Sequence, residues 1–144
     1  MDFEEQDCRW VFLGFESPKA GQPVQFWFDN LTEEHRDAIK DQLAFLQVTP
    51  RAIWEEPFFD PLIGEEGISE IRFVPIKSLL AKFYYRIYGF FGAEEEETYK
   101  FLHATNKKSR NDRHGKKIAK RRLRELQNGE AELHPFGLDG KSSS

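Results

Sequence analysis

Cations and tyrosines alternate along one short stretch of this sequence, and this stretch is where its side chains are best placed to do chemistry. Residues Ala81–Phe90 (AKFYYRIYGF) have the alternation typical of a β-strand. One face of that strand would carry Lys82, Tyr84, Arg86 and Tyr88. Tyrosine rings stack on bases while lysine and arginine bind phosphates, so this face fits a groove for single-stranded nucleic acid. The structural alternative is cation–π packing beneath a helix, with Arg86 paired to a carboxylate.

A second cationic feature lies farther along the chain. Between Lys107 and Arg124 there are ten lysines and arginines and a single acid, Asp112. Such a run favours a polyanionic partner, because each basic side chain that meets a phosphate releases counterions. The alternatives are a solvated helix face or a patch that the acidic half of the chain neutralises. The residues of this run that we expect to contact nucleic acid are Arg110, Arg113, Lys116, Lys117 and Lys120.

Three further positions could take part in chemistry on a phosphate. Arg72 shares a strand face with Glu70, which could neutralise it. His103 lies near the end of the last predicted strand, where a histidine is either a hydrogen-bonded core residue or a catalyst. Lys107 and Lys108 follow it directly, in a segment that could place several cations around one phosphate.

No familiar catalytic or metal-binding pattern accompanies these residues. The phosphate-loop, dinucleotide, nucleophile-elbow and zinc-protease motifs are absent from the sequence. The four histidines are scattered, and we expect neither a metal nor a cofactor. The single cysteine excludes an intramolecular disulfide.

The elements that must position these residues follow from periodicity and from turn and cap residues. The chain should fold as one domain over residues 1–129, followed by a flexible tail over 130–144. The predicted order is a strand at Arg9–Phe15, a helix from Pro23, a helix capped by Asn30 or Thr32 and ending near Gln47, strands at Ser69–Val74, Ala81–Phe90 and Thr98–Thr105, and a helix from Asn111 or Asp112 to Leu126.

Charge is unevenly divided along the chain. Residues 1–70 carry a net charge of −11 and residues 71–144 a net charge of +7, although the whole chain is only at −4. Hydrophobic residues make up 39% of the sequence, which is enough for a core. The acidic start does not resemble a signal peptide, and no apolar stretch is long enough to span a membrane, so we expect a cytoplasmic protein.

Four short motifs occur in an order that resembles a known family. They are GISEIR, FYYRIYGFF, YKFLHATNKK and a terminal helix containing IAKRRLREL. Over residues 9–126 the chain is similar to the RelE/HigB-like toxins of bacterial type II toxin–antitoxin modules, in their phage-derived branch. The resemblance implies an α+β fold with two N-terminal helices packed on a curved antiparallel sheet of about four strands, and a C-terminal basic helix.

The resemblance also implies an activity and roles for individual residues. It implies a metal-independent endoribonuclease that cuts mRNA on the ribosome, arrests translation and is held inactive by a cognate antitoxin of the helix-turn-helix type. Arg72 and Arg86 match the family's strand arginines and would stabilise charge. Lys107 or Lys108 would position the phosphate or act as the acid, and His103 and Tyr84 would transfer protons. The alternatives are a gyrase-poisoning toxin on the same fold and a mobile-element accessory protein that only binds nucleic acid.

Overall fold

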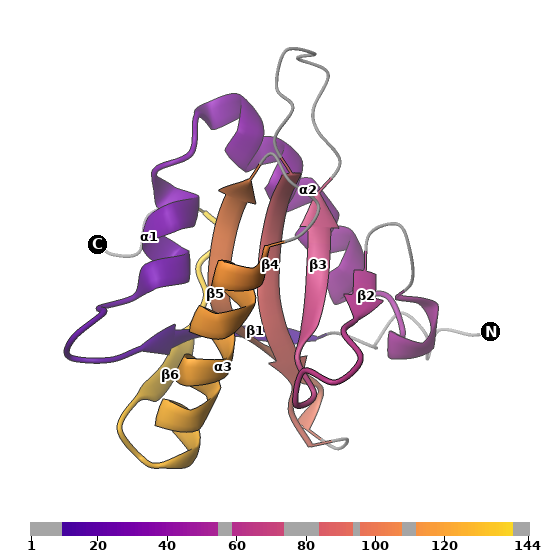
Figure 1. Ribbon diagram of the computed structural model, residues 1–144. Coiled ribbons are helices and arrows are strands. Elements are labelled where there is room, and N and C mark those ends of the chain that lie inside the picture. Colours follow the sequence, from indigo (N-terminus) through magenta and orange to yellow (C-terminus); the bar gives the residue numbers. More distant parts are fainter. Residues whose placement is uncertain (1–9, 55–58, 74–83, 94–95, 108–111, 140–144) are drawn as a thin grey trace.

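One mixed β-sheet with helices on both faces forms the protein (Figure 1). The computed structural model describes residues 10–54, 59–73, 84–93, 96–107 and 112–139. In chain order the elements are β1 (Val11–Glu16), α1 (Pro23–Asp29), α2 (Glu33–Gln47), the short 3-10 helix η2 (Arg51–Ile53), β2 (Phe59–Pro61), β3 (Ser69–Phe73), β4 (Tyr84–Phe91), β5 (Thr98–Lys107), α3 (Arg113–Gln127) and β6 (Glu132–Pro135). The fold is therefore α+β, as predicted.

Within the described residues the sheet has six strands in the order β2-β3-β4-β5-β1-β6. Neighbouring strands run antiparallel, except that β1 and β5 run parallel, with Val11 opposite Thr98 and Gly14 opposite Phe101. The prediction of an antiparallel sheet of about four strands was thus wrong in strand direction and number. Hydrophobic alternation reveals a strand but not its partner, and the short edge strands β2 and β6 have too few residues to show alternation.

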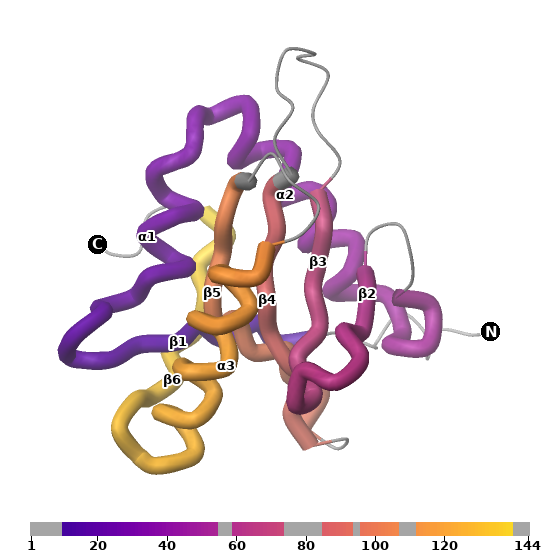
Figure 2. The backbone as a smooth tube through the Cα atoms, viewed as in Figure 1, coloured from indigo at the N-terminus to yellow at the C-terminus, as the bar shows by residue number. Residues whose placement is uncertain are grey.

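Strand β6 also corrects the prediction of a flexible tail after Gly129. It pairs antiparallel with β1, with Leu13 opposite Pro135 (Figure 2). The next residue, Phe136, is buried, and its backbone N–H donates to the carbonyl of Phe12. Residues 132–136 are therefore part of the domain, because they complete the pairing of β1 on its second side.

Local signals explain where the helices begin. Pro23 occupies the first turn of α1, where its missing N–H leaves no hydrogen bond unmade. The Thr32 side chain accepts a hydrogen bond from the backbone N–H of His35 and caps α2. Asp112 caps α3 in the same way through the N–H of Gly115. These three starts match the sequence prediction.

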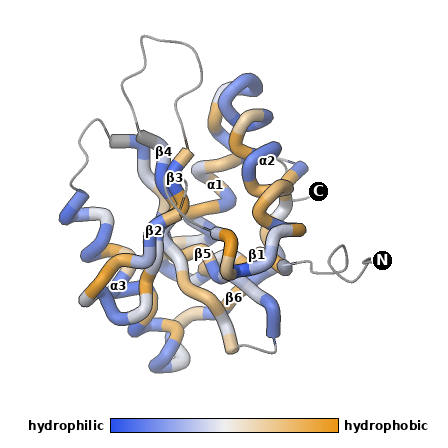
Figure 3. The backbone as a smooth tube through the Cα atoms, turned by 90° about the vertical axis from the view of Figure 1, so that its right-hand side faces the viewer, coloured by the Kyte–Doolittle hydropathy of each residue, from blue (hydrophilic) through white to orange (hydrophobic). Residues whose placement is uncertain are grey.

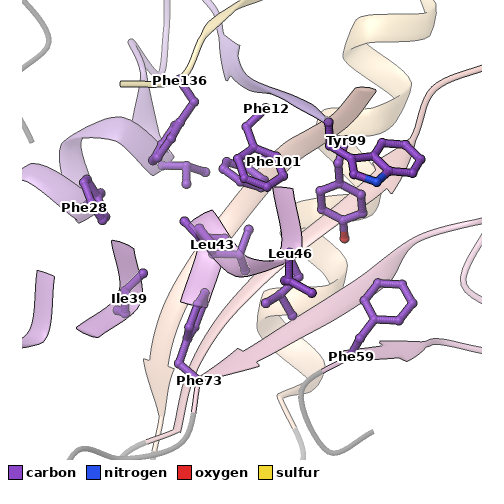
Figure 4. Close-up of a cluster of buried hydrophobic side chains, with 14 of the residues drawn as sticks. Phe12, Phe28, Ile39, Leu43, Leu46, Phe59, Phe73, Tyr99, Phe101 and Phe136 are labelled. Carbon is purple, nitrogen blue, oxygen red and sulfur yellow. The ribbon is translucent and has the colours of Figure 1, made fainter. Parts of the chain in front are cut away.

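The two faces of the sheet carry different cores. Helices α1 and α2 cover one face and α3 covers the other, which the side view shows clearly (Figure 3). The larger cluster, between α1, α2 and the sheet, is rich in aromatic rings and includes Phe28, Leu43 and Phe101 (Figure 4). Strand β1 contributes Phe12 to this cluster and Phe15 to the smaller one beneath α3. This strand therefore packs against a cluster on each face of the sheet.

Candidate nucleic-acid interface

The pairing of β3, β4 and β5 gathers most of the residues singled out in the sequence into adjacent rows. Residues two apart on a strand share a face, so these rows lie on one side of the sheet. From β3 to β5 the rows are Arg72–Arg86–Thr105 and Glu70–Tyr88–His103, and Tyr84 pairs with Lys107 in the row beyond. This is the α3 side, because Tyr88 packs against Ala119 and Leu123 of that helix. We call these rows the polar face.

Helix α3 leaves one end of the polar face clear of helical cover. In Figure 1 the helix begins part-way along β4 and β5 and runs toward the opposite end of the sheet. Arg72 is the next-to-last residue of β3, and Arg86 and Thr105 each lie two residues from the matching end of their strands. The row that contains both arginines therefore lies toward the strand ends that project beyond α3 (Figure 1).

A shared carboxylate holds the two arginines together. Glu70 Oε2 lies 2.5 Å from Arg72 Nε and 3.6 Å from Arg86 Nε. Arg72 Nη2 also contacts Asp60 Oδ2 at 2.8 Å. The neutralising role that the sequence suggested for Glu70 is thus present, and Glu70 serves both guanidinium groups. Arg86 is only 2% exposed, whereas the Arg72 side chain is 35% exposed, so Arg72 is the arginine that a ligand in solution meets first.

Tyr88 does not have the role in base stacking predicted for it. Its side chain is 0% exposed, and its hydroxyl donates to Asp112 Oδ2 at 3.0 Å. Burial, together with the nearby carboxylates of Asp112 and Glu70, raises the pKa of Tyr88 well above its usual range. Tyr88 therefore links β4 to the start of α3 and is a structural residue, because α3 covers it and its hydroxyl binds the residue that caps that helix.

His103 lies beside Tyr88 with the two rings nearly parallel, at an interplanar angle of 6°. Its Nδ1 is 3.3 Å from Nη1 of Arg122 on α3. Burial, and then the positive charge of Arg122, lower the pKa of His103 to about 4. The imidazole is therefore neutral near pH 7. Sequence reasoning missed Arg122, since nothing distinguishes it by type from the other cations of the basic run.

The exposed side of α3 presents a row of cations. Arg113, Lys117 and Arg121 are exposed, and their spacing of four residues places them on one side of the helix. Two other cations are paired with the loop before β3: Lys120 Nζ lies 2.6 Å from Glu65 Oε1, and Arg124 Nη2 lies 2.8 Å from Glu66 Oε2. The acidic half of the chain thus neutralises part of the run, and the exposed row remains available to a polyanion.

The structure describes some of the predicted site residues only in part and others not at all. Lys82, Lys108 and Arg110 lie outside the described residues. Tyr84 and Lys107 are placed by their backbone pairing, and Lys116 is half-buried on α3. Across the described ranges, no three histidine, cysteine or acidic side chains are grouped so as to hold a metal ion. In the same ranges no helix has both the length and the apolar character needed to cross a membrane.

Comparisons with known proteins identify no relative of this chain. No family model, curated protein or solved structure matches this chain. The resemblance to RelE/HigB-like toxins consequently stays a prediction, and the chemistry of the polar face and of α3 is what bears on function.

Proposed function

We propose that this protein is the toxin of a toxin–antitoxin module, and that it binds mRNA on the polar face and cleaves it at the ribosome. The observation that supports this proposal best is the placement of Arg72 directly opposite Arg86, one row from His103. The partly exposed Arg72 guanidinium suits a phosphate, because it offers several fixed N–H donors and stays charged. A cognate antitoxin would hold the free toxin inactive by covering this face.

The reaction would be a phosphoryl transfer within the RNA itself. The ribose 2′-oxygen forms a bond to the neighbouring phosphorus, the bond from phosphorus to the 5′-oxygen breaks, and the 2′-proton passes to a base while an acid protonates the leaving oxygen. Negative charge grows on the non-bridging oxygens, and Arg72 would stabilise it. Arg86 would hold Glu70, and through it Arg72, in place.

Proton transfer needs two more groups beside the arginines. The candidates that the sequence supplies are His103, Tyr84, Lys107 and Lys108. Tyr84 and Lys107 pair with each other one row beyond Arg86, toward the end of the sheet that projects past α3. This pairing makes the strand ends the natural place for the acid and the base.

A second function, nucleic-acid binding without cleavage, has its own support. Arg86, Glu70 and Tyr88 are almost wholly buried, and a buried group does not touch a substrate unless the face opens. The exposed cations of α3 would then be the main contact, and the polar face would chiefly join α3 to the sheet. Arg72 would be dispensable in that case.

Ribosome-dependent cleavage of a translating mRNA, mapped by primer extension, separates these functions. We expect cuts that require ribosomes, and a loss of at least about tenfold in Arg72→Ala, as for removal of one charge-stabilising donor. Arg124→Ala is the matched control, since Arg124 is likewise a partly exposed arginine in an ion pair but lies on α3. To test Arg86, the variant to use is Arg86→Lys, checked for an unchanged melting temperature. Arg86→Ala is unsuitable because it would leave buried Glu70 without one of its partners.

The other outcomes each have a definite meaning. Growth arrest with intact mRNA would move the proposal to another target, such as gyrase. If neither arrest nor cleavage is seen, the binding function remains. RNA affinity should then fall steeply with salt, and each alanine at Arg113, Lys117 or Arg121 should lower the salt slope by about one. Cleavage that is unchanged in Arg72→Ala would show that the polar face is not the active site.

A further inference from the structure

Arg122 contacts His103 in a way that fixes where the imidazole proton resides. Arg122 Nη1 lies 3.0 Å from the carbonyl oxygen of Leu102 and 3.3 Å from His103 Nδ1. This nitrogen carries two N–H bonds, one for each acceptor. The guanidinium also lies over the ring of Phe15, 5.4 Å from its centroid, and the Arg122 side chain is partly buried. Helix α3 therefore holds Arg122 against both the histidine and the β5 backbone.

The contact has one consistent assignment of donor and acceptor. A guanidinium donates hydrogen bonds and never accepts them, so Nδ1 of His103 must be the acceptor. A nitrogen that accepts carries no proton. Since a neutral imidazole has a single N–H, the proton of His103 resides on Nε2.

The charged and titratable groups around His103 act in the same direction overall. On β4, Tyr88 stacks on the ring, and its hydroxyl is committed to Asp112. On α3, Arg122, Arg121 and His114 disfavour a positive imidazole, and only Asp112, at the helix start, favours it. Burial disfavours the charged form most, so the neutral ring is the stable one.

We propose that Arg122 is a positioning residue that keeps His103 neutral with its proton on Nε2, so that His103 meets the RNA phosphate as a hydrogen-bond donor and takes no proton from the 2′-hydroxyl. The role toward RNA rests on the proposed function, whereas the state of His103 does not. This proposal removes His103 from the proton-transfer candidates and leaves that task to Tyr84, Lys107 and Lys108.

The state of His103 can be measured without RNA. Long-range proton–nitrogen correlation spectra of the whole protein report which ring nitrogen is protonated, and a pH titration reports the pKa. We expect the neutral His103 ring to carry its proton on Nε2 at every pH, and to gain a second proton only below about pH 5. Arg122→Met keeps an unbranched side chain over Phe15 but has no donor, and should raise the His103 pKa by at least about one unit and mix the two tautomers.

Two further variants make this measurement specific. Arg122→Lys, which keeps a cation and a donor, should keep the neutral Nε2–H form, and Arg121→Met should shift the His103 pKa by less than about 0.3 units because Arg121 makes only a minor contribution. A proton on Nδ1 in the parent, or an unchanged His103 pKa in an Arg122→Met variant that retains its melting temperature, would overturn the proposal.

Cleavage measurements then test the role toward RNA. The parent should show no inflection in rate between about pH 5.5 and 8 from His103, and Arg122→Met should gain one at the pKa seen in its spectra. His103→Gln keeps an N–H donor and should retain cleavage within about tenfold, whereas His103→Ala should lose more. Equal losses in both variants would refute the donor role. If no variant cleaves RNA, the proposed function fails while the spectra still decide the state of His103.

Discussion

Helices α2 and α3 are both fifteen residues long and lie on opposite faces of the same sheet, yet they pack in different ways. Helix α2 sets Ile39, Leu43 and Leu46 into a cluster of sixteen buried residues. Helix α3 sets Ala119 and Leu123 into a cluster of six. Apolar burial is the dominant favourable contribution to folding, so the α2 side supplies most of the stability. Because the α3 side supplies less of the apolar burial, it can hold polar residues at a smaller cost to stability.

The polar groups beneath α3 satisfy one another instead of adding much stability. Glu70 faces two arginines, and Asp112 accepts from Tyr88 and from the N–H of Gly115. Removing charges from water offsets most of what such pairs gain, although breaking one partner is costly. A face built this way has a defined geometry and contributes only a modest net free energy to folding.

The largest expected difference between the two faces is in the cost of truncating a core residue. Phe101 contacts Phe12, Tyr99 and Phe136 and is wholly buried on the α2 side. We expect Phe101→Ala to lower the unfolding free energy by about 3–5 kcal/mol and Leu123→Ala, on the α3 side, by about 2–3 kcal/mol. Urea denaturation measures both. A larger loss in Leu123→Ala would invert the comparison and make the α3 side the main core.

Acid should weaken the α3 side more than the α2 side. The pKa of His103 is about 4 in the folded protein, below the ordinary value of 6.5, so the unfolded chain binds more protons between these values and stability falls as the pH drops through this range. Between about pH 7 and pH 5 the parent should lose about 1–2 kcal/mol more than His103→Gln. Urea denaturation at the two pH values gives this difference. Equal losses would mean that His103 titrates normally.

The first turn of α3 offers a substitution whose expected sign is unusual. Replacing glycine by alanine normally stabilises a helix. A Cβ on Gly115, however, would come so close to the Asp112 carboxylate that the cap and the bond from Tyr88 must move. We therefore expect Gly115→Ala to destabilise the protein by about 1 kcal/mol. Thermal unfolding beside Lys117→Ala, an exposed substitution on the same helix, tests this, and a rise in melting temperature would show that the cap adjusts freely.

The smallest expected effect is at the surface ion pair between Arg124 and Glu66. Arg124 is more than half exposed, so water and salt weaken the pair. Arg124→Ala should change stability by less than about 0.5 kcal/mol, whereas Lys120→Ala, whose partner Glu65 is less exposed, should cost somewhat more. A double-mutant cycle for each pair is the measurement. A coupling above about 1 kcal/mol at Arg124–Glu66 would show that this loop secures α3 to the sheet.

The helices could be predicted from sequence because their signals are local. Pro23, Thr32 and Asp112 each act within one turn, and the apolar spacing of α2 is complete within the helix itself. The pairing of β1 with β5 and β6 is different, since it joins segments far apart in the chain and depends on packing that no local pattern encodes. The short segment around His134 was missed for this reason.

The candidate site divides in the same way. Alternation alone shows that Arg86 and Tyr88 share a strand face, but the strand register is needed to set Arg72 opposite Arg86. The burial of Tyr88 follows from where α3 docks, which a single sequence does not reveal. Arg122 differs from its neighbours only in the side of the helix it occupies, so its contact with His103 becomes visible only once the helix is placed.

The position of β1 between β5 and β6 determines how late in its synthesis the chain can complete its sheet. The first described strand has no partner until residues near Thr98 and then Pro135 have been synthesised. At about 5–20 residues per second, the roughly 80 residues from Glu16 to Thr98 take about 4–16 s, during which Phe12 and Phe15 have no sheet to join, and the pairing with β6 comes later still. The sheet that carries the polar face is thus completed only after Pro135 has been synthesised.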